Sequence, residues 1–184
     1  MSDPWTVRAA TEDDLATVTA IRIRSWRAGY AGLLPAAALD GLDAEADLRR
    51  RREFFRSGPP GIVTLVATDP AGAIAAFCIT GPYRDDERDL ADASLSGSVG
   101  EVYALYTDPP RWGGGAGRAL LAAAVGLLAE RGLDPVRLWV LAGNQRARRF
   151  YESAGFAADG AAASFEIAGE ESPEVRYSFV GPRP

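Results

Sequence analysis

Apolar and polar positions recur along this chain of 184 residues with the spacings of helices and strands. Leu15, Val18 and Ile21 follow one another at helical spacing, which predicts a first helix that runs to about Gly29. A further helix is predicted over residues 43–55, where the aspartate at the first position can cap the free amides of the first turn. The N-terminal third of the chain is therefore predicted to be mainly helical.

The middle of the chain carries short apolar runs that are typical of β-strands. Residues 62–68 and 73–80 are separated by a turn that contains Pro and Gly, and they predict a β-hairpin. Residues 99–107 predict the next strand. The acidic segment between them, residues 83–97, is predicted to be a loop.

Helix and strand patterns alternate in the last third of the chain. An apolar helix that ends near Gly132 is followed by a predicted strand over residues 136–142, a capped helix over 144–154, and strands over 156–167 and 175–180. This order predicts an α/β (α+β) fold whose sheet mixes parallel and antiparallel pairs. The length suits one core, so residues 1–184 are expected to form a single domain.

Charge narrows the classes of partner. The net charge is −5 and the isoelectric point is about 4.9, which argues against a nucleic-acid partner or an anionic membrane and mildly favours cationic substrates. The N-terminus is polar and no apolar stretch is long enough to cross a bilayer, so a cytoplasmic protein is expected.

Metal and thiol chemistry have little support in the composition. Cys78 is the single cysteine and lies in an apolar run, so it is interpreted as a small core residue. The chain has no histidine, which removes the commonest metal ligand and the commonest general base, and no metal site is expected.

A glycine-rich turn follows the strand over residues 99–107 and opens the next helix. Its members are Gly113, Gly114, Gly115, Ala116, Gly117 and Arg118. Free backbone N–H groups at a helix start bind anions, so the turn is predicted to hold a pyrophosphate. A P-loop is excluded because the chain has no lysine, and the G-x-G-x-x-G dinucleotide fingerprint is excluded because no third glycine falls at the required position.

A second motif follows one strand later. It runs Asn144-Gln145-Arg146-Ala147-Arg148-Arg149-Phe150-Tyr151 and closes with Gly155-Phe156. Together the two motifs resemble those of the GNAT superfamily of N-acetyltransferases, in which a Gln/Arg-x-x-Gly-x-Gly loop precedes Asn-x-x-Ala-x-x-Phe-Tyr. Gly115 and Gly117 fill the two glycine positions. Trp112 stands where Gln or Arg is usual and Gly114 where Arg often stands, so a side-chain contact to the phosphates is expected to be missing.

The resemblance implies a fold and an acyl donor. It implies a mixed, mostly antiparallel sheet of about six to seven strands flanked by helices, with two central parallel strands splayed apart. The donor is acetyl-CoA, whose pantetheine arm lies between the splayed strands and pairs with backbone groups of Leu105, Tyr106 and Thr107. The N–H groups from Gly113 to Arg118 hold the pyrophosphate. Asn144 contacts the cofactor or an ordered water, or serves only as a helix cap.

The implied activity is transfer of an acetyl group to a primary amine of a small molecule or peptide, by direct attack in a ternary complex. Tyr151 is the candidate general acid for the leaving thiolate, with a role as a core aromatic residue as the alternative. Glu101 is the candidate general base. A strand glutamate can instead face solvent or pair with an arginine, and Tyr103 or a water relay are competitors for the role.

The sequence leaves the acceptor open. Trp26 and Tyr30 line an acceptor pocket in one interpretation and belong to the core in the other. The acidic segment from Arg84 to Asp89 either draws a cationic amine or is a solvated loop. A homodimer is also left open. Rival functions are a non-catalytic acyl-CoA sensor or partner-binding module, and an unrelated phosphate-binding domain that prefers a nucleotide.

Overall fold

The alternation of helices and strands is present in the computed structural model, which describes residues 5–84 and 95–181. The strands in those ranges are β1 (Thr6–Ala9), β2 (Val63–Thr68), β3 (Ile74–Arg84), β4 (Leu95–Thr107), β5 (Val136–Leu141), β6 (Phe156–Ile167) and β7 (Glu170–Phe179). The helices are α1 (Leu15–Gly29), α2 (Ala36–Asp40), α3 (Ala44–Ser57), α4 (Ala116–Glu130) and α5 (Gln145–Ser153), with short 3₁₀ turns at Glu12–Asp14 and Pro109–Arg111.

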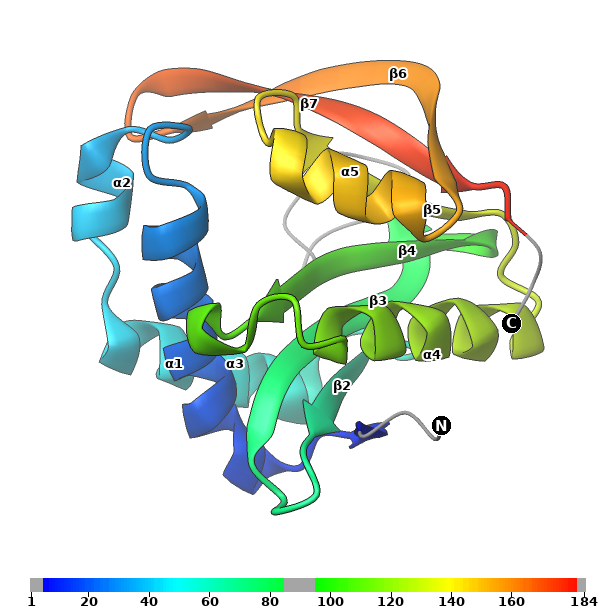
Figure 1. Ribbon diagram of the computed structural model, residues 1–184, viewed down its shortest axis with the longest axis horizontal. Coiled ribbons are helices and arrows are strands. Elements are labelled where there is room, and N and C mark those ends of the chain that lie inside the picture. The colour runs from blue at the N-terminus through cyan, green and yellow to red at the C-terminus, as the bar shows by residue number, and fades with distance from the viewer. Residues whose placement is uncertain (1–4, 85–94, 182–184) are drawn as a thin grey trace.

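The strands form one sheet in the order β1-β2-β3-β4-β5-β7-β6 (Figure 1). Neighbours pair antiparallel except β4 and β5, which are parallel. The described part of the chain therefore confirms the predicted mixed, mostly antiparallel sheet of six to seven strands. The parallel pair lies at the centre of the sheet, where the order of strands places the middle of the chain beside its last third.

Side chains on the two faces of the sheet pack against different helices. Phe77 on β3 packs with Val18 and Ile21 of α1, whereas its neighbour Cys78 packs in the larger cluster that includes Leu120 of α4. This follows from the strand period of two, which sends successive side chains to opposite faces. Helices α1 and α4 therefore cover opposite faces of β3 (Figure 1). Both helices also contact the central strand β4.

The two parallel strands separate soon after they meet. Their pairing is confined to Gly100 with Val136 and Glu101 with Arg137. On the other side of β4, the register with β3 shifts so that Tyr103 is an extra residue, a β-bulge that bends the strand. Beyond these positions β4 and β5 diverge, which confirms the predicted splay.

Three element boundaries differ from the sequence prediction. Strands β3 and β4 extend into the segment 83–97 that was predicted to be a loop, and residues 85–94 of that segment lie outside the described residues. Strand β7 begins at Glu170, five residues before the predicted start at Val175. Gly, Pro and charged residues in these stretches hide the strand pattern, and pairing with neighbouring strands overrides their low β-propensity. Helix α2 was not predicted because its five residues are too few to show helical periodicity.

The predicted start of α3 and the predicted end of α1 are confirmed. The carboxylate of Asp43 accepts hydrogen bonds from the amides of Glu45 and Ala46 at 2.9 and 3.0 Å, which satisfies two free N–H groups at the start of α3. Helix α1 ends at Gly29, as the spacing of its apolar residues indicated.

A buried ion pair joins β3 to β4 just where the parallel pairing ends. Glu101 is fully buried, and its Oε1 accepts a hydrogen bond of 2.6 Å from Nη2 of Arg84. The backbone N–H of Arg84 donates to Oε2 of the same carboxylate at 3.0 Å. Both carboxylate oxygens are thus engaged inside the sheet.

Removing one member of this pair should be costly. Arg84→Met leaves the Glu101 carboxylate buried without its cation, so we expect a loss of about 3 kcal/mol in the free energy of unfolding. Urea denaturation followed by circular dichroism measures it. Arg49→Met, which breaks an exposed pair with Glu45, is the matched control and should change the free energy by less than about 0.5 kcal/mol. Equal effects of the two variants would contradict a stabilising role for the buried pair.

Candidate functional site

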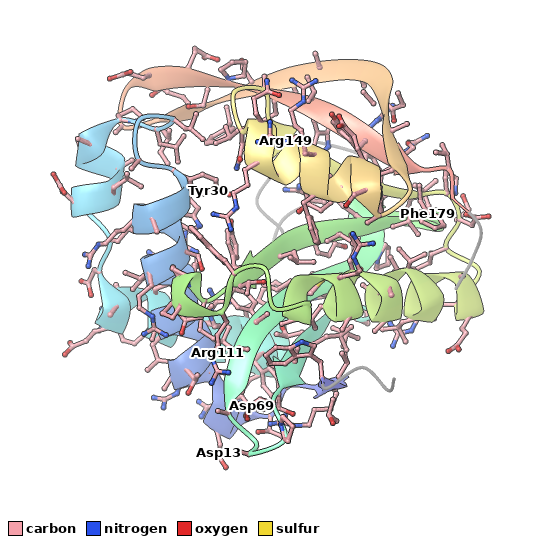
Figure 2. All side chains as sticks on the ribbon, viewed as in Figure 1. Asp13, Tyr30, Asp69, Arg111, Arg149 and Phe179 are labelled. Atoms are coloured by element: carbon pink, nitrogen blue, oxygen red, sulfur yellow. The ribbon has the colours of Figure 1, made fainter. Side chains whose placement is uncertain are left out.

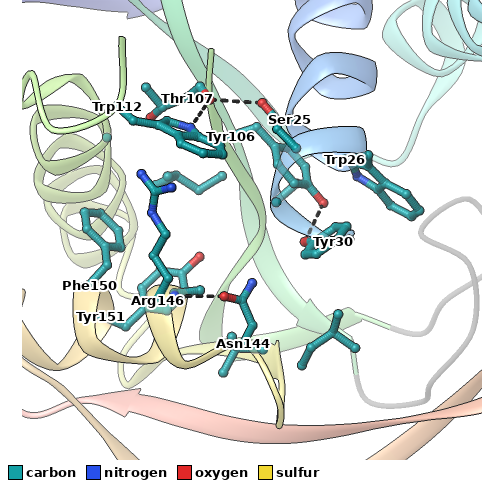
Figure 3. Close-up of a pocket in the computed structure, with 18 of the residues that line it drawn as sticks. Ser25, Trp26, Tyr30, Tyr106, Thr107, Trp112, Asn144, Arg146, Phe150 and Tyr151 are labelled. Carbon is teal, nitrogen blue, oxygen red and sulfur yellow. Dashed lines mark hydrogen bonds between the residues drawn. The ribbon is translucent and has the colours of Figure 1, made fainter. Parts of the chain in front are cut away.

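A cavity of about 680 Å³ opens where β4 and β5 separate. The glycine turn before α4 and the start of α5 border one end, and α1 borders the other (Figure 3). Beyond their two paired residues, β4 and β5 do not hydrogen-bond to each other, so backbone groups of β4 lie at the wall of the cavity. The cavity therefore exists because these two strands separate.

The glycine turn has a backbone that requires glycine. Gly113 and Gly115 have φ angles of 80° and 93°, in the left-handed region that side chains disfavour. Gly117 lies so close to β4 that a Cβ atom would be 3.0 Å from Oγ1 of Thr107. Ala116, Gly117 and Arg118 open α4, so their amides have no carbonyl partner within the helix and border the cavity.

Gly114 differs from its neighbours in the turn. Its N–H donates to the carbonyl of Arg111 at 3.2 Å, and its carbonyl accepts from Nε1 of Trp5 at 2.6 Å. It is not among the residues that line the cavity. The side chain of Arg111 in turn binds Asp69 at 2.9 Å, which anchors the turn to the β2–β3 connection (Figure 2). The backbone of Gly114 therefore shapes the turn instead of facing the cavity.

Trp112 carries two contacts that the sequence did not reveal. Its indole Nε1 donates to the carbonyl of Thr107 at 2.7 Å, and the hydroxyl of Ser25 on α1 donates to the same carbonyl at 3.0 Å. The guanidinium of Arg146, from the first turn of α5, lies 3.6 Å from the centre of the Trp112 ring (Figure 3). The residue that departs from the usual motif thus holds an arginine beside the glycine turn.

The pairing of β4 with β3 decides which backbone groups of β4 face the cavity. The amide of Asp108 donates to the carbonyl of Ala75, so Asp108 and Ala75 form a hydrogen-bonded pair. Hydrogen-bonded pairs recur at every second residue of an antiparallel ladder, so the backbone N–H and C=O of Tyr106 point toward Phe77 on β3. The backbone groups of Leu105 and Thr107 point the other way, toward the gap. Since the carbonyl of Thr107 is already engaged twice, the groups available there are both polar groups of Leu105 and the amide of Thr107.

Tyr151 lies on α5 at the wall of the cavity. Its side chain is 9% exposed, and its ring makes an edge contact with Phe150 at 5.2 Å between centroids. Burial raises the pKa of its phenol, and the neighbouring Cys78 and Tyr106 add to the shift. The hydroxyl therefore stays protonated at neutral pH and is available as a hydrogen-bond donor.

Asn144 caps α5 and borders the cavity at the same time. Its side-chain oxygen accepts a hydrogen bond from the amide of Ala147 at 3.0 Å (Figure 3). The side-chain NH2 group has two donors that this cap does not use. The two interpretations of Asn144, cap and ligand contact, are therefore compatible in one geometry.

Glu101 does not reach the cavity. Its carboxylate is enclosed by Arg84, and it is absent from the residues that line the cavity. Pairing with an arginine, one of the alternatives that the sequence left open, is what the structure shows. Its assignment as general base thus has no support from this geometry. The acidic segment beyond Arg84 lies outside the described residues.

The other end of the cavity is lined with aromatic rings. Trp26 on α1 and Tyr30, the residue after its last turn, meet edge to face at 5.2 Å between ring centroids. The hydroxyl of Tyr30 lies 3.3 Å from that of Tyr106, and all three residues line the cavity (Figure 3). Trp139 on β5, Phe165 on β6 and Glu174 on β7 also line the cavity. Their placement depends on the register of β5, β6 and β7, so no local sequence signal marked them.

Two other kinds of feature are absent from the described residues. No group of three or more His, Cys, Asp or Glu side chains is arranged to hold a metal ion. No helix in these residues has the length and apolar character needed to span a membrane.

Comparison with known proteins decides the family. A model of the acetyltransferase (GNAT) family matches residues 22–156. The chain belongs to this family. It is 30% identical over 172 residues to the uncharacterized N-acetyltransferase YuaI of Bacillus subtilis (strain 168), a match that covers 92% of this chain and 90% of that protein.

One further relative matches this acetyltransferase in sequence over part of its length, and another matches it in structure over its whole length. The mycothiol acetyltransferase of Salinispora tropica is 37% identical over 123 residues, which cover 66% of this chain and 37% of that enzyme, so the chain spans little more than a third of that relative. The PaiA N-acetyltransferase from Thermoplasma acidophilum, solved in complex with coenzyme A, superposes with a TM-score of 0.67 at 19% identity, covering 97% of this chain and 100% of that one. The latter likeness shows the GNAT fold.

Two glycines of α4 provide a test of how closely the start of this helix packs on β4. Gly117→Ala should not stabilise the acetyltransferase, because the new methyl group would press on Thr107 and lie 3.5 Å from Cδ2 of Leu105. Gly126→Ala, in the same helix with open space around it, should add about 0.5–1 kcal/mol to the free energy of unfolding. Urea denaturation compares them, and equal gains would show that the close packing of Gly117 has no energetic weight.

Proposed function

We propose that this acetyltransferase moves the acetyl group of acetyl-CoA to a primary amine of a small molecule or peptide, by direct attack while both substrates are bound. The observation that carries the proposal is the coincidence of three features in one cavity: unpaired strand backbone, free helix amides and the Tyr151 hydroxyl. Direct transfer is supported by the burial of Cys78, which raises the pKa of its thiol to about 12 and removes a nucleophile for a covalent acyl-enzyme.

The donor end fits the parts of coenzyme A. The amides of Gly113, Ala116 and Gly117 can bind the pyrophosphate at the positive end of the α4 dipole. The backbone of Leu105 can pair with the amides of the pantetheine arm as a neighbouring strand would. Arg146, held on Trp112, supplies a cation beside the turn and compensates for the missing Gln or Arg at position 112.

The chemistry needs two proton movements. Acetyl-CoA supplies a thioester activated toward nucleophiles. An alkyl amine with a pKa of about 10 must lose a proton to water or a side chain before its nitrogen attacks. Tyr151 is proposed to donate a proton to the departing sulfur and to regain one from solvent, so the proton lost by the amine is balanced by the proton gained by the thiol.

The experiment that tests this function is thiol release from acetyl-CoA over a panel of polyamines, aminoglycosides, amino acids, aryl amines and short peptides, with hydrolysis in buffer subtracted. Amine-dependent release together with an acetylated product supports the transferase. Binding of acetyl-CoA without release for any amine would favour the acyl-CoA sensor, and a melting temperature raised by ATP but not by acetyl-CoA would favour the nucleotide-binding alternative.

Arg146 is expected to strengthen donor binding. Arg146→Gln removes the charge beside the glycine turn and should raise the Kd for acetyl-CoA by roughly tenfold, the usual scale of a charge-assisted hydrogen bond. Isothermal titration calorimetry measures it. Arg149→Gln, one turn further along α5 and outside the cavity lining, is the matched control (Figure 2). Equal Kd values for the two variants would remove Arg146 from the donor site.

Tyr151 is expected to act on the rate and not on donor affinity. Tyr151→Phe keeps the ring in its aromatic surroundings but removes the donor, so kcat should fall on the order of 10²-fold while the Kd for acetyl-CoA stays unchanged. Steady-state kinetics with the best amine of the panel and calorimetry separate the two quantities. An unchanged kcat would assign Tyr151 to the core alone.

A further inference from the structure

A second cavity, of about 290 Å³, lies where α3 meets the sheet. It is bordered by the first residue of α1, the C-terminal half of α3, the connection over residues 58–62, and strands β2 and β3. Among the described residues, none lines both this cavity and the one between β4 and β5. The second cavity is therefore a separate site from the one to which acetyl transfer is assigned.

The walls of the second cavity are mainly apolar. Leu15, Phe54 and Ile79 supply aliphatic and aromatic side chains, and Phe55 adds a ring that is 42% exposed. Arg51 is the single charged residue in the described lining, and no carboxylate is part of it. An apolar cavity with one or a few polar groups is typical of a site for a small organic molecule.

The guanidinium of Arg51 is poorly neutralised by the protein. Its Nη2 lies 3.5 Å from Oδ2 of Asp47, which is longer than a well-formed charge-assisted hydrogen bond. Its Nε is enclosed and has no hydrogen-bond partner in the described part of the chain. The ring of Phe77, 5.3 Å from the guanidinium carbon, offers only a weak cation–π contact. Arg51 thus retains hydrogen-bonding and charge capacity that its neighbours do not use.

Asp47 cannot neutralise Arg51 because two other arginines share its carboxylate. Arg22 of α1 lies 3.4 Å from Oδ2, and Arg50 lies 3.5 Å from Oδ1. Three guanidinium groups therefore face one carboxylate. Burial lowers the pKa of the Arg51 guanidinium and Arg22 lowers it further, although Asp47 opposes the shift. An additional anion at this position would relieve the repulsion between the arginines.

We propose that the second cavity binds an organic monocarboxylate, whose carboxylate pairs with Arg51 and whose hydrocarbon tail lies against Leu15, Phe54 and Ile79. A guanidinium donates strong hydrogen bonds to a carboxylate, and an apolar tail gains free energy when it leaves water. Inorganic phosphate would leave the apolar walls uncovered, and a neutral hydrocarbon would leave Arg51 without a counter-ion. The proposal goes beyond the proposed function and does not depend on it.

Two probes of similar shape test the site. Octanoate should bind about tenfold more tightly than 1-octanol at pH 7.5, where the carboxyl group is ionised, as measured by isothermal titration calorimetry. In Arg51→Met this preference should fall to less than about threefold, whereas Arg51→Lys keeps the charge and should keep a larger preference. Arg52→Met, at an exposed neighbouring position outside the cavity lining, is the matched control and should keep the tenfold preference.

The position of octanoate is tested in the unaltered protein by amide NMR shifts, which also decide the proposal if Arg51→Met does not fold. The amides of Gly58 and Gly61, which border the second cavity, should shift on addition of octanoate. Shifts confined to residues of the cavity between β4 and β5, equal affinity for the two probes, or an undiminished preference in a folded Arg51→Met would each overturn the site. Thiol release from acetyl-CoA tests the transferase separately, so either proposal can fail while the other stands.

Discussion

The separation of two parallel strands is the constraint on which the rest of the structure depends. Strands β4 and β5 share only two residue pairs, and the buried pair of Arg84 with Glu101 lies at the point where they part. A sheet ordinarily satisfies its backbone groups with neighbouring strands, so such a gap leaves polar groups that a ligand can complete. The bulge at Tyr103 and the double engagement of the Thr107 carbonyl keep β4 in this open position.

The gap also connects two faces of the sheet that helices otherwise keep apart. Tyr151 belongs to the cluster on the α4 side, whereas Tyr30 and Tyr106 belong to the α1 side, and all three border one cavity. A donor and an acceptor can therefore approach from different sides and meet without either passing through the core.

Local sequence predicted the features that depend on local geometry. The glycines at 113, 115 and 117, the caps at Asp43 and Asn144, and strand β6 were all found where the sequence placed them, because turns, caps and alternation are properties of neighbouring residues. Features that depend on register were not predictable. The burial of Glu101, the stacking of Arg146 on Trp112 and the position of Glu174 each require partners that lie more than fifteen residues away in the chain. A strand pattern shows which positions alternate, but not what faces each side chain from the neighbouring strand.

One small residue has a practical consequence for study of this protein. Cys78 is the only cysteine of the chain, and its thiol is enclosed between β3 and α4. The folded molecule thus offers no thiolate of its own to an electrophilic dye, so colour that develops in a reaction mixture belongs to a small-molecule product. When the same dye is added with denaturant, each unfolded chain reacts with one dye molecule, so the dye signal measures the concentration of unfolded protein. The single buried thiol therefore reports unfolding without adding to the signal of an activity assay.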